Sequence, residues 1–251
     1  LCAGAATGSA SVLVTGGTAP FIYQWSPSGG TAAAATGLNA GTYSIAVTDG
    51  NHCVTGISVV ISEPPALQVN TSTTDALCAG ATDGSVSTNV TGGVAPYTYS
   101  WNPGGSTTAL LSSVPAGIYT VDVHDANGCL QSATSIVSQP SALSLNLSAV
   151  NPVSCAGGSN GSAALSASGG TPSYQYTWSP SGGTTASASG LNAGNYLVTL
   201  TDGHNCQSTV SVVITQPTPL QLTSSTSNVL CNGGNTGNIS LNVSGGTASY
   251  S

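Results

Sequence analysis

Cysteine spacing constrains this chain more than any other feature. The seven cysteines stand at positions 2, 53, 78, 129, 155, 206 and 231. A separation of 51 residues occurs three times, and the first cysteine of each pair recurs after 76 or 77 residues. Regular cysteine use in short units is typical of disulfide-stabilised domains in an oxidising compartment. We therefore expect three tandem domains and the start of a fourth, in a secreted or cell-surface protein.

The same spacing predicts one disulfide inside each domain. The expected pairs are Cys2–Cys53, Cys78–Cys129 and Cys155–Cys206, and Cys231 is expected to lack a partner. Closing a loop of about 52 residues would stabilise a domain by roughly 4 kcal/mol. A domain of about 76 residues needs such help because it buries a small share of its surface. The predicted domains, hereafter repeats 1 to 4, are residues 1–64, 65–140, 141–217 and 218–251.

Hydrophobic alternation predicts β-strands throughout. The stretch AGTYSIAVTDGNHC, ending at Cys53, recurs as AGIYTVDVHDANGC and AGNYLVTLTDGHNC, ending at Cys129 and Cys206. Its apolar and polar residues alternate with the period of a half-buried strand, and an aspartate turn follows. We count about six short strands per repeat, with a Ser/Thr/Gly-rich connection between two of them, and find no helical period. The predicted fold class is all-β, a tandem array of small Ig-like or PKD-like β-sandwich domains.

Charge excludes several functions. The chain has no Lys or Arg and seven Asp or Glu residues, a net charge of −7. Without cations to meet phosphates, we expect no binding to nucleic acid. No apolar run reaches the roughly 18 residues of a membrane span, so direct membrane insertion is not expected.

One acidic column could bind metal. Asp49, Asp125 and Asp202 occupy equivalent positions. The simpler interpretation is that each carboxylate accepts backbone N–H bonds in its own turn. The alternative is calcium, which takes six to eight oxygen ligands, so that one carboxylate per repeat would need carbonyls and water to complete the site.

The aromatic residues also form columns. Trp25, Trp101 and Trp178 are equivalent, and each precedes a proline-containing, Gly-rich turn. Core packing explains such regular placement, whereas partial exposure would let the tryptophans stack on sugars as a glycan-binding rim. The histidines at 52, 124 and 204 form no column, and no serine has a matching base. We therefore expect no catalytic residues, no cofactor and no enzymatic activity.

The order of these motifs resembles the SprB repeat family. In repeat 2 the residues that carry the resemblance are Cys78, Gly92, Gly93, Pro96, Tyr97, Tyr99, Trp101, Gly117, Tyr119, Asp125, Gly128 and Cys129. The resemblance implies a cell-surface gliding adhesin of Bacteroidota, exported by the type IX secretion system. Ser173 and Ser249 replace the proline before the aromatic residue. That departure concerns turn geometry alone.

Three functions follow as hypotheses. The first is a structural and adhesive protein that forms an extended stalk or filament and contacts a surface polysaccharide or copies of itself. The second is a glycan-binding module that uses the tryptophan column. The third is a passive spacer for a binding or catalytic domain elsewhere. We also expect the polypeptide to continue on both sides, with strand donation between chains as the alternative.

Overall fold

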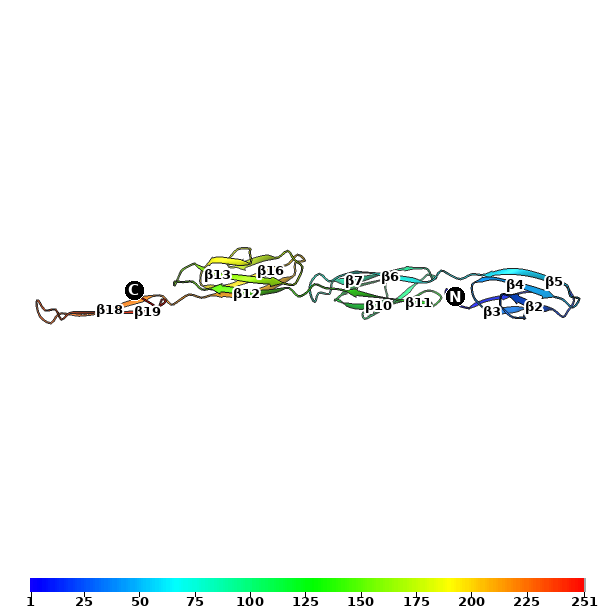
Figure 1. Ribbon diagram of the computed structural model, residues 1–251, viewed down its shortest axis with the longest axis horizontal. Coiled ribbons are helices and arrows are strands. Elements are labelled where there is room, and N and C mark those ends of the chain that lie inside the picture. The colour runs from blue at the N-terminus through cyan, green and yellow to red at the C-terminus, as the bar shows by residue number, and fades with distance from the viewer. Residues whose placement is uncertain (251) are drawn as a thin grey trace. The chain divides into compact units, whose positions relative to one another are not determined.

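The computed structural model describes residues 1–250 and contains only β-strands, turns and loops in that range (Figure 1). Two compact units divide it. One comprises Leu1–Asp75 and Thr82–Ser138, and the other comprises Ala76–Ala81 and Gln139–Ser251. These units do not test the predicted boundaries of the four repeats, which stay a prediction. No helix in the described part of the chain is long and apolar enough to cross a membrane.

Repeats 2 and 3 each form two three-stranded antiparallel sheets. In repeat 2 the sheets are β6-β7-β9 and β8-β10-β11, formed by β6 (Gln68–Thr74), β7 (Gly84–Thr91), β8 (Thr98–Asn102), β9 (Leu110–Val114), β10 (Gly117–His124) and β11 (Leu130–Val137). In repeat 3 they are β12-β13-β15 and β14-β16-β17, formed by β12 (Ser144–Asn151), β13 (Gly161–Ser168), β14 (Gln175–Ser179), β15 (Ser187–Leu191), β16 (Gly194–Thr201) and β17 (Gln207–Ile214).

Repeat 1 has one strand fewer. Its sheets are β1-β3 and β2-β4-β5, formed by β1 (Gly8–Ser11), β2 (Ile22–Ser26), β3 (Ala34–Leu38), β4 (Gly41–Thr48) and β5 (Val54–Ile61). Repeat 4 is a two-stranded ribbon in the described residues, formed by β18 (Gln221–Ser227) and β19 (Asn238–Ser244). The predicted all-β sandwich architecture is confirmed.

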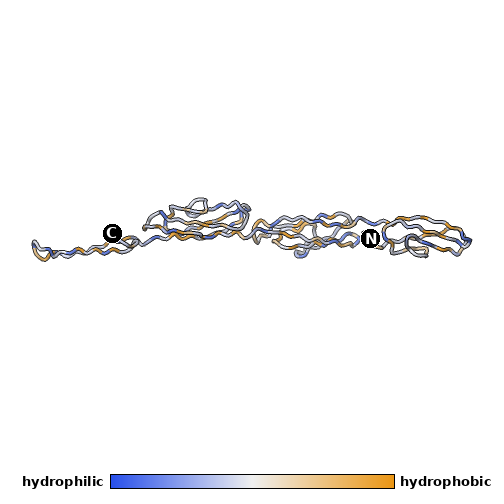
Figure 2. The backbone as a smooth tube through the Cα atoms, in the orientation of Figure 1, coloured by the Kyte–Doolittle hydropathy of each residue, from blue (hydrophilic) through white to orange (hydrophobic). Residues whose placement is uncertain are grey.

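A separate apolar core lies between the two sheets of each of repeats 1 to 3, because alternate residues of facing strands point inward. Figure 2 shows this alternation of apolar and polar residues along the strands. The core of repeat 3 contains Leu145, Val153, Ala163, Leu165, Trp178, Ala188, Leu191, Tyr196, Val198, Leu200, Val212 and Ile214. Equivalent side chains form the cores of repeats 1 and 2.

One strand per repeat was not expected from its sequence. The Ser/Thr/Gly-rich stretch before AG-x-Tyr, interpreted as a connection, forms β3, β9 and β15. These strands pair with β1, β7 and β13, each through a register shift next to a glycine. Their apolar anchors Leu38, Val114 and Leu191 are buried. Hence the stretch closes one sheet of the sandwich.

Candidate functional site

The aspartate turn runs from the conserved-column aspartate to the second cysteine of a repeat, at 49–53, 125–129 and 202–206. In repeat 3, Asp202 Oδ1 accepts the N–H groups of His204 and Cys206, both at 2.9 Å. Its Oδ2 accepts the N–H of Thr171 at 2.8 Å. Asp49 and Asp125 accept the same three kinds of bond. The predicted turn-stabilising role of these carboxylates is confirmed.

These bonds lower the pKa of each carboxyl, because N–H donors favour the ionised form. The bond from Cys53 has the largest effect on the pKa of Asp49, and the bond from Thr171 has the largest on the pKa of Asp202. Burial is the largest single effect on the pKa of Asp125 and raises it, but the three backbone bonds outweigh burial. All three aspartates therefore stay ionised below the usual pKa of an aspartate, and each charge is matched by donors.

The double glycine that follows the second strand of each repeat lies against this turn. Gly93 has φ of 61°, and a Cβ added to it would lie 3.0 Å from Asp125 Oδ2. A side chain there would collide with the carboxylate and strain the backbone. The double glycine thus allows the chain to approach close enough for Val94 to donate its N–H.

The fourth residue of the aspartate turn is His52, Gly128 or Asn205, three side chains without common chemistry. Their φ angles are 65°, 78° and 65°, all in the left-handed region. Glycine adopts that region freely, and asparagine and histidine adopt it more readily than most residues. This position therefore serves backbone geometry, which a comparison of side-chain types alone does not reveal.

A second turn, the first-cysteine turn, carries the first cysteine of each repeat. It is closed by a backbone bond to the carbonyl of Cys2, Cys78, Cys155 or Cys231 from the residue three positions on. A residue just after the last strand of the repeat holds it: Glu63 Oε2 accepts from Gly4 N at 2.5 Å, and Gln216 Oε1 accepts from Gly157 N at 2.8 Å. Gln139 accepts from Gly80 N in the same way, at 2.7 Å.

The predicted disulfides within single repeats are wrong. The structure pairs Cys2 with Cys129 and Cys78 with Cys206, with Cα–Cα distances of 5.7 Å in both. Each bond joins the first cysteine of one repeat to the second cysteine of the next. Cys53 and Cys155, both expected in disulfides, are free and exposed, as is Cys231, for which no partner was predicted.

Strand length explains the correction. In repeat 3 the first-cysteine turn lies at the end of β17, because Val153 N donates to Thr215 O. Cys206 immediately precedes the start of β17, which is eight residues long. Eight residues of strand span about 25 Å, whereas a disulfide requires Cα atoms within about 7 Å. The two cysteines of one repeat therefore lie at opposite ends of its last strand and cannot bond.

Each disulfide lies among polar contacts that join the same two turns. Asn127 Nδ2 donates to Leu1 O at 2.8 Å beside the Cys2–Cys129 bond. His204 Nδ1 lies 3.3 Å from Leu77 O beside the Cys78–Cys206 bond. We call this set of a first-cysteine turn, an aspartate turn and their disulfide the cystine junction. It is the candidate functional site of the chain.

The tryptophans do not form an exposed rim. Trp25, Trp101 and Trp178 are 7%, 2% and 5% exposed. The indole Nε1 of each donates at 2.9 Å to a backbone carbonyl seven residues on, that of Ala32, Thr108 or Thr185. No face of these rings is open to a sugar, because they pack in the cores. The hypothesis of a glycan-binding tryptophan rim is therefore wrong.

The tyrosine of AG-x-Tyr is explained in the same way. Tyr119 is buried, and its hydroxyl donates to Pro115 O at 2.8 Å, four residues upstream. Tyr43 and Tyr196 make the equivalent bonds at 3.2 and 3.0 Å. A buried tyrosine that bonds the backbone just upstream of its strand fixes the corner of the sandwich, as in immunoglobulin-like domains. The motif thus serves the fold.

Metal ligands are sparse among residues 1–250, where no group of three or more His, Cys, Asp or Glu side chains is placed to hold an ion. At each aspartate turn both carboxylate oxygens already accept N–H bonds. Calcium at Asp49, Asp125 or Asp202 stays a hypothesis that needs a direct test.

Solved structures with similar folds are distant. The chain is 13% identical to the N-terminal eight Ig domains of Down Syndrome Cell Adhesion Molecule, with a TM-score of 0.39, over 78% of this chain and 32% of that one. It is 11% identical to Sidekick-1 immunoglobulin domains 1–5, with a TM-score of 0.31, over 96% and 63%. For domains 1–6 of the surface layer protein SbsC the values are 12%, 0.29, 90% and 43%. The chain thus spans about a third of the first of these proteins.

Among curated proteins no sequence match is found. The model of the SprB repeat, in contrast, matches residues 1–30, 70–106, 147–184 and 223–251, together more than half of the chain. Each match covers a first-cysteine turn. With the disulfides, the match indicates an extracellular or surface repeat protein of adhesin-like type. The chain belongs to the SprB repeat family.

Proposed function

We propose that this chain is a load-bearing and adhesive segment of a surface stalk or filament, in which cystine junctions hold successive repeats together. The observation that carries the proposal is the disulfide pattern. Both disulfides join neighbouring repeats, so that each joined pair is connected by the peptide linker and by a covalent bond beside it. A segment that only needed stable domains would gain more from disulfides inside each one.

Tension acts on the linkers of a tandem array. The linker after β5, Ser62–Ala66, lies next to the junction because Pro65 O accepts the N–H of Gly93 and Glu63 holds the first-cysteine turn. A pull that separates repeats 1 and 2 at this point must break the Cys2–Cys129 bond or unfold a repeat. This arrangement suits a molecule that transmits force at a cell surface. Gliding motility, export by type IX secretion and a polysaccharide target belong to this proposal through the family resemblance.

Repeat exchange in the producing organism tests the proposal. Cells are compared that carry the native array, no array, or an unrelated Ig-domain array of equal length, and attachment to polysaccharide-coated glass is measured under flow. We expect attachment with the native array alone. Attachment restored by the unrelated array would reduce the repeats to a passive spacer, and attachment without any array would overturn the adhesive role.

Strain at the junctions is tested separately. We expect the Cys2→Ser, Cys78→Ser double variant to attach in still medium but to detach at lower shear than the native array. Unchanged shear resistance would contradict the load-bearing part of the proposal. A Cys231→Ser variant controls for loss of a cysteine, because Cys231 forms no disulfide in the described residues.

A further inference from the structure

Repeat 1 has an uncovered sheet edge. β1 pairs with β3 alone in the described residues, whereas β7 and β13, the equivalent strands of repeats 2 and 3, each pair with a further strand, β6 or β12. β6 and β12 also pack against the last strand of their own sandwich, β11 or β17. In repeat 1 the position of this strand is empty. An open edge of this kind accepts an added strand.

The last strand of repeat 1 is uncovered as a result. Val59 lies opposite Tyr43, on the core-facing side of β5, yet it is 36% exposed. Its equivalent in repeat 3, Val212, lies opposite Tyr196 and is 0% exposed. Ile57, also core-facing, is exposed as well. Repeat 1 therefore presents an apolar groove between β1 and β5 of the size of one strand.

Repeat 4 holds the complementary strand. β18 is equivalent to β6 and β12, but every residue of β18 is exposed in its ribbon with β19. Leu222 is 64% exposed, whereas its equivalent in repeat 3, Leu145, is 6% exposed. β18 thus has the apolar pattern of the missing strand and no core to pack against. Neither β18 nor β1 carries a charged residue, so no repulsion opposes their pairing.

We propose that β18 of one chain completes repeat 1 of a second copy of the chain, by leaving β19 and pairing with β1. The register of β6 with β7, in which Gln68 faces Thr91 and Thr74 faces Ser85, defines the pairing. Transferred by equivalent positions, it places Gln221 opposite Thr15 and Ser227 opposite Ser9. The exchange keeps the number of backbone hydrogen bonds about constant and buries Leu222 against the groove, which favours it.

A disulfide then joins the two copies. In repeats 1 and 2 the strand β6 follows its linker, and the repeat that contains β6 brings its Cys129 to Cys2 of the repeat before. By the same geometry, the copy that receives β18 brings its Cys53 to Cys155 of the donor. Cys53 is ready for this bond, because its N–H donates to Asp49 Oδ1 at 2.9 Å, as that of Cys129 does to Asp125.

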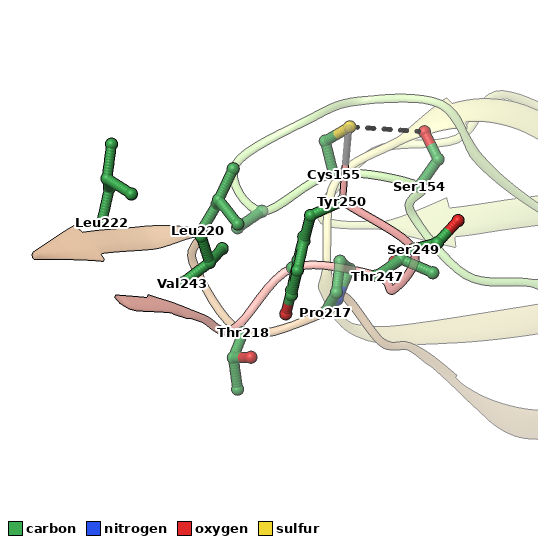
Figure 3. Close-up of a pocket in the computed structure, with 12 residues that line it drawn as sticks. Ser154, Cys155, Pro217, Thr218, Leu220, Leu222, Val243, Thr247, Ser249 and Tyr250 are labelled. Atoms are coloured by element: carbon green, nitrogen blue, oxygen red, sulfur yellow. Dashed lines mark hydrogen bonds between the residues drawn. The ribbon is translucent and has the colours of Figure 1, made fainter. Parts of the chain in front are cut away.

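Cys155 is accessible at the matching place. It borders a pocket of about 500 Å³ whose other lining residues include Pro217, Leu220, Leu222 and Tyr250. Figure 3 shows the Cys155 thiol beside Tyr250 and above the start of β18. Its turn is held by Gln216 as the turn of Cys2 is held by Glu63. The pocket is therefore where the aspartate turn of the second copy would dock.

The bond requires an oxidant. The Cys53 and Cys155 thiols lose two electrons and two protons to a low-molecular-weight disulfide, such as oxidised glutathione, which becomes two thiols. Exchange proceeds through a mixed disulfide on one cysteine, which the thiolate of the other attacks. Because every chain carries one donor strand and one acceptor edge, the product is a head-to-tail polymer.

Non-reducing gel electrophoresis in a glutathione redox buffer tests this assembly. We expect a ladder at multiples of the 24.3 kDa chain mass, which lengthens with protein concentration and collapses on reduction. Cys53→Ser and Cys155→Ser should each abolish it, while Cys231→Ser should leave it intact. A ladder lost with Cys231→Ser instead, or an oxidised product that stays monomeric, would overturn the proposal.

A strand variant separates docking from chance oxidation. Leu222→Asp places a charge in the groove and should reduce the ladder at least tenfold, whereas Thr223→Asp, on the outer face of the same strand, should leave it. Equal ladders in both variants would show that thiols alone drive the linkage and would overturn strand donation. The assembly does not depend on the adhesive role, since attachment is not among its readouts.

Discussion

Replacing Trp101 with alanine tests whether the aromatic columns are core. Trp101 is 2% exposed in the core of repeat 2, and its Nε1 donates to Thr108 O at 2.9 Å. Truncating a buried tryptophan costs about 3 to 5 kcal/mol. A domain of this size has a total stability of roughly 4 to 11 kcal/mol. The variant should therefore lose about half of the stability of repeat 2.

The expected readout is thermal. For a domain of 60 to 100 residues, 1 kcal/mol shifts Tm by about 4 to 8 °C, so the transition of repeat 2 should fall by at least about 12 °C in calorimetry. Hydrogen exchange in β8, β10 and β11 should accelerate in parallel, which assigns the transition to repeat 2. Repeat 3 should keep its protection, because its core contains no residue of repeat 2.

Ile118→Ala is the matched control. Ile118 lies in β10 of the same repeat but is 62% exposed, so its truncation should cost about 0.5 kcal/mol or less. An unchanged Tm in Trp101→Ala, or an equal loss in both variants, would refute the assignment of the tryptophan column to the core.

Three further predictions concern the aspartate turn. First, the lowered pKa values of Asp49, Asp125 and Asp202 stabilise the fold at pH values above the unfolded aspartate pKa of about 3.9. That contribution is lost as pH falls through the lower folded pKa values, so Tm measured from pH 6 to pH 2 should drop mainly below about 3.9; a drop centred above pH 5 would contradict it. Second, Gly170→Ala should destabilise repeat 3 because its Cβ would collide with Asp202, whereas Gly183→Ala, with φ also positive but open space around the Cβ, should cost less; equal urea midpoints would contradict the close approach. Third, Tm should be the same in calcium and in chelator, because backbone N–H groups already occupy the carboxylates, and a rise of several degrees in calcium would support the metal hypothesis instead.

Much of the fold was predictable from periodicity. The alternation around Tyr119, Val121 and Val123 predicts β10 with the correct inward face, because strand residues alternate between faces and burial selects one set. The strand β9 was missed because Ser112 and Ser113 interrupt its apolar pattern, and only Val114 signals that the segment packs on the core. Short edge strands are specified by pairing and packing more than by composition.

The disulfide pattern was not predictable from spacing. A separation of 51 residues records distance along the chain, and it is equally regular whether bonds form within a repeat or between neighbours. The decisive fact is that β5 and β17 carry one cysteine before their first residue and the other near their last. That places the cysteines at opposite ends of a sandwich, which only the strand order reveals. The aspartate turn, by contrast, depends on local bonds and was predictable from its residues.

Peptide mapping under non-reducing conditions tests the cystine junction most directly. After free thiols are alkylated, a protease that cleaves before aspartate yields, among others, peptides 1–48, 49–74, 75–82, 125–201 and 202–251. The junctions predict that 1–48 is linked to 125–201 through Cys2 and Cys129, that 75–82 is linked to 202–251 through Cys78 and Cys206, and that 49–74 is released with an alkylated Cys53. Linkage of 1–48 to 49–74, with 75–82 joined to 125–201, would mean that each disulfide closes a single repeat and would contradict the cystine junction.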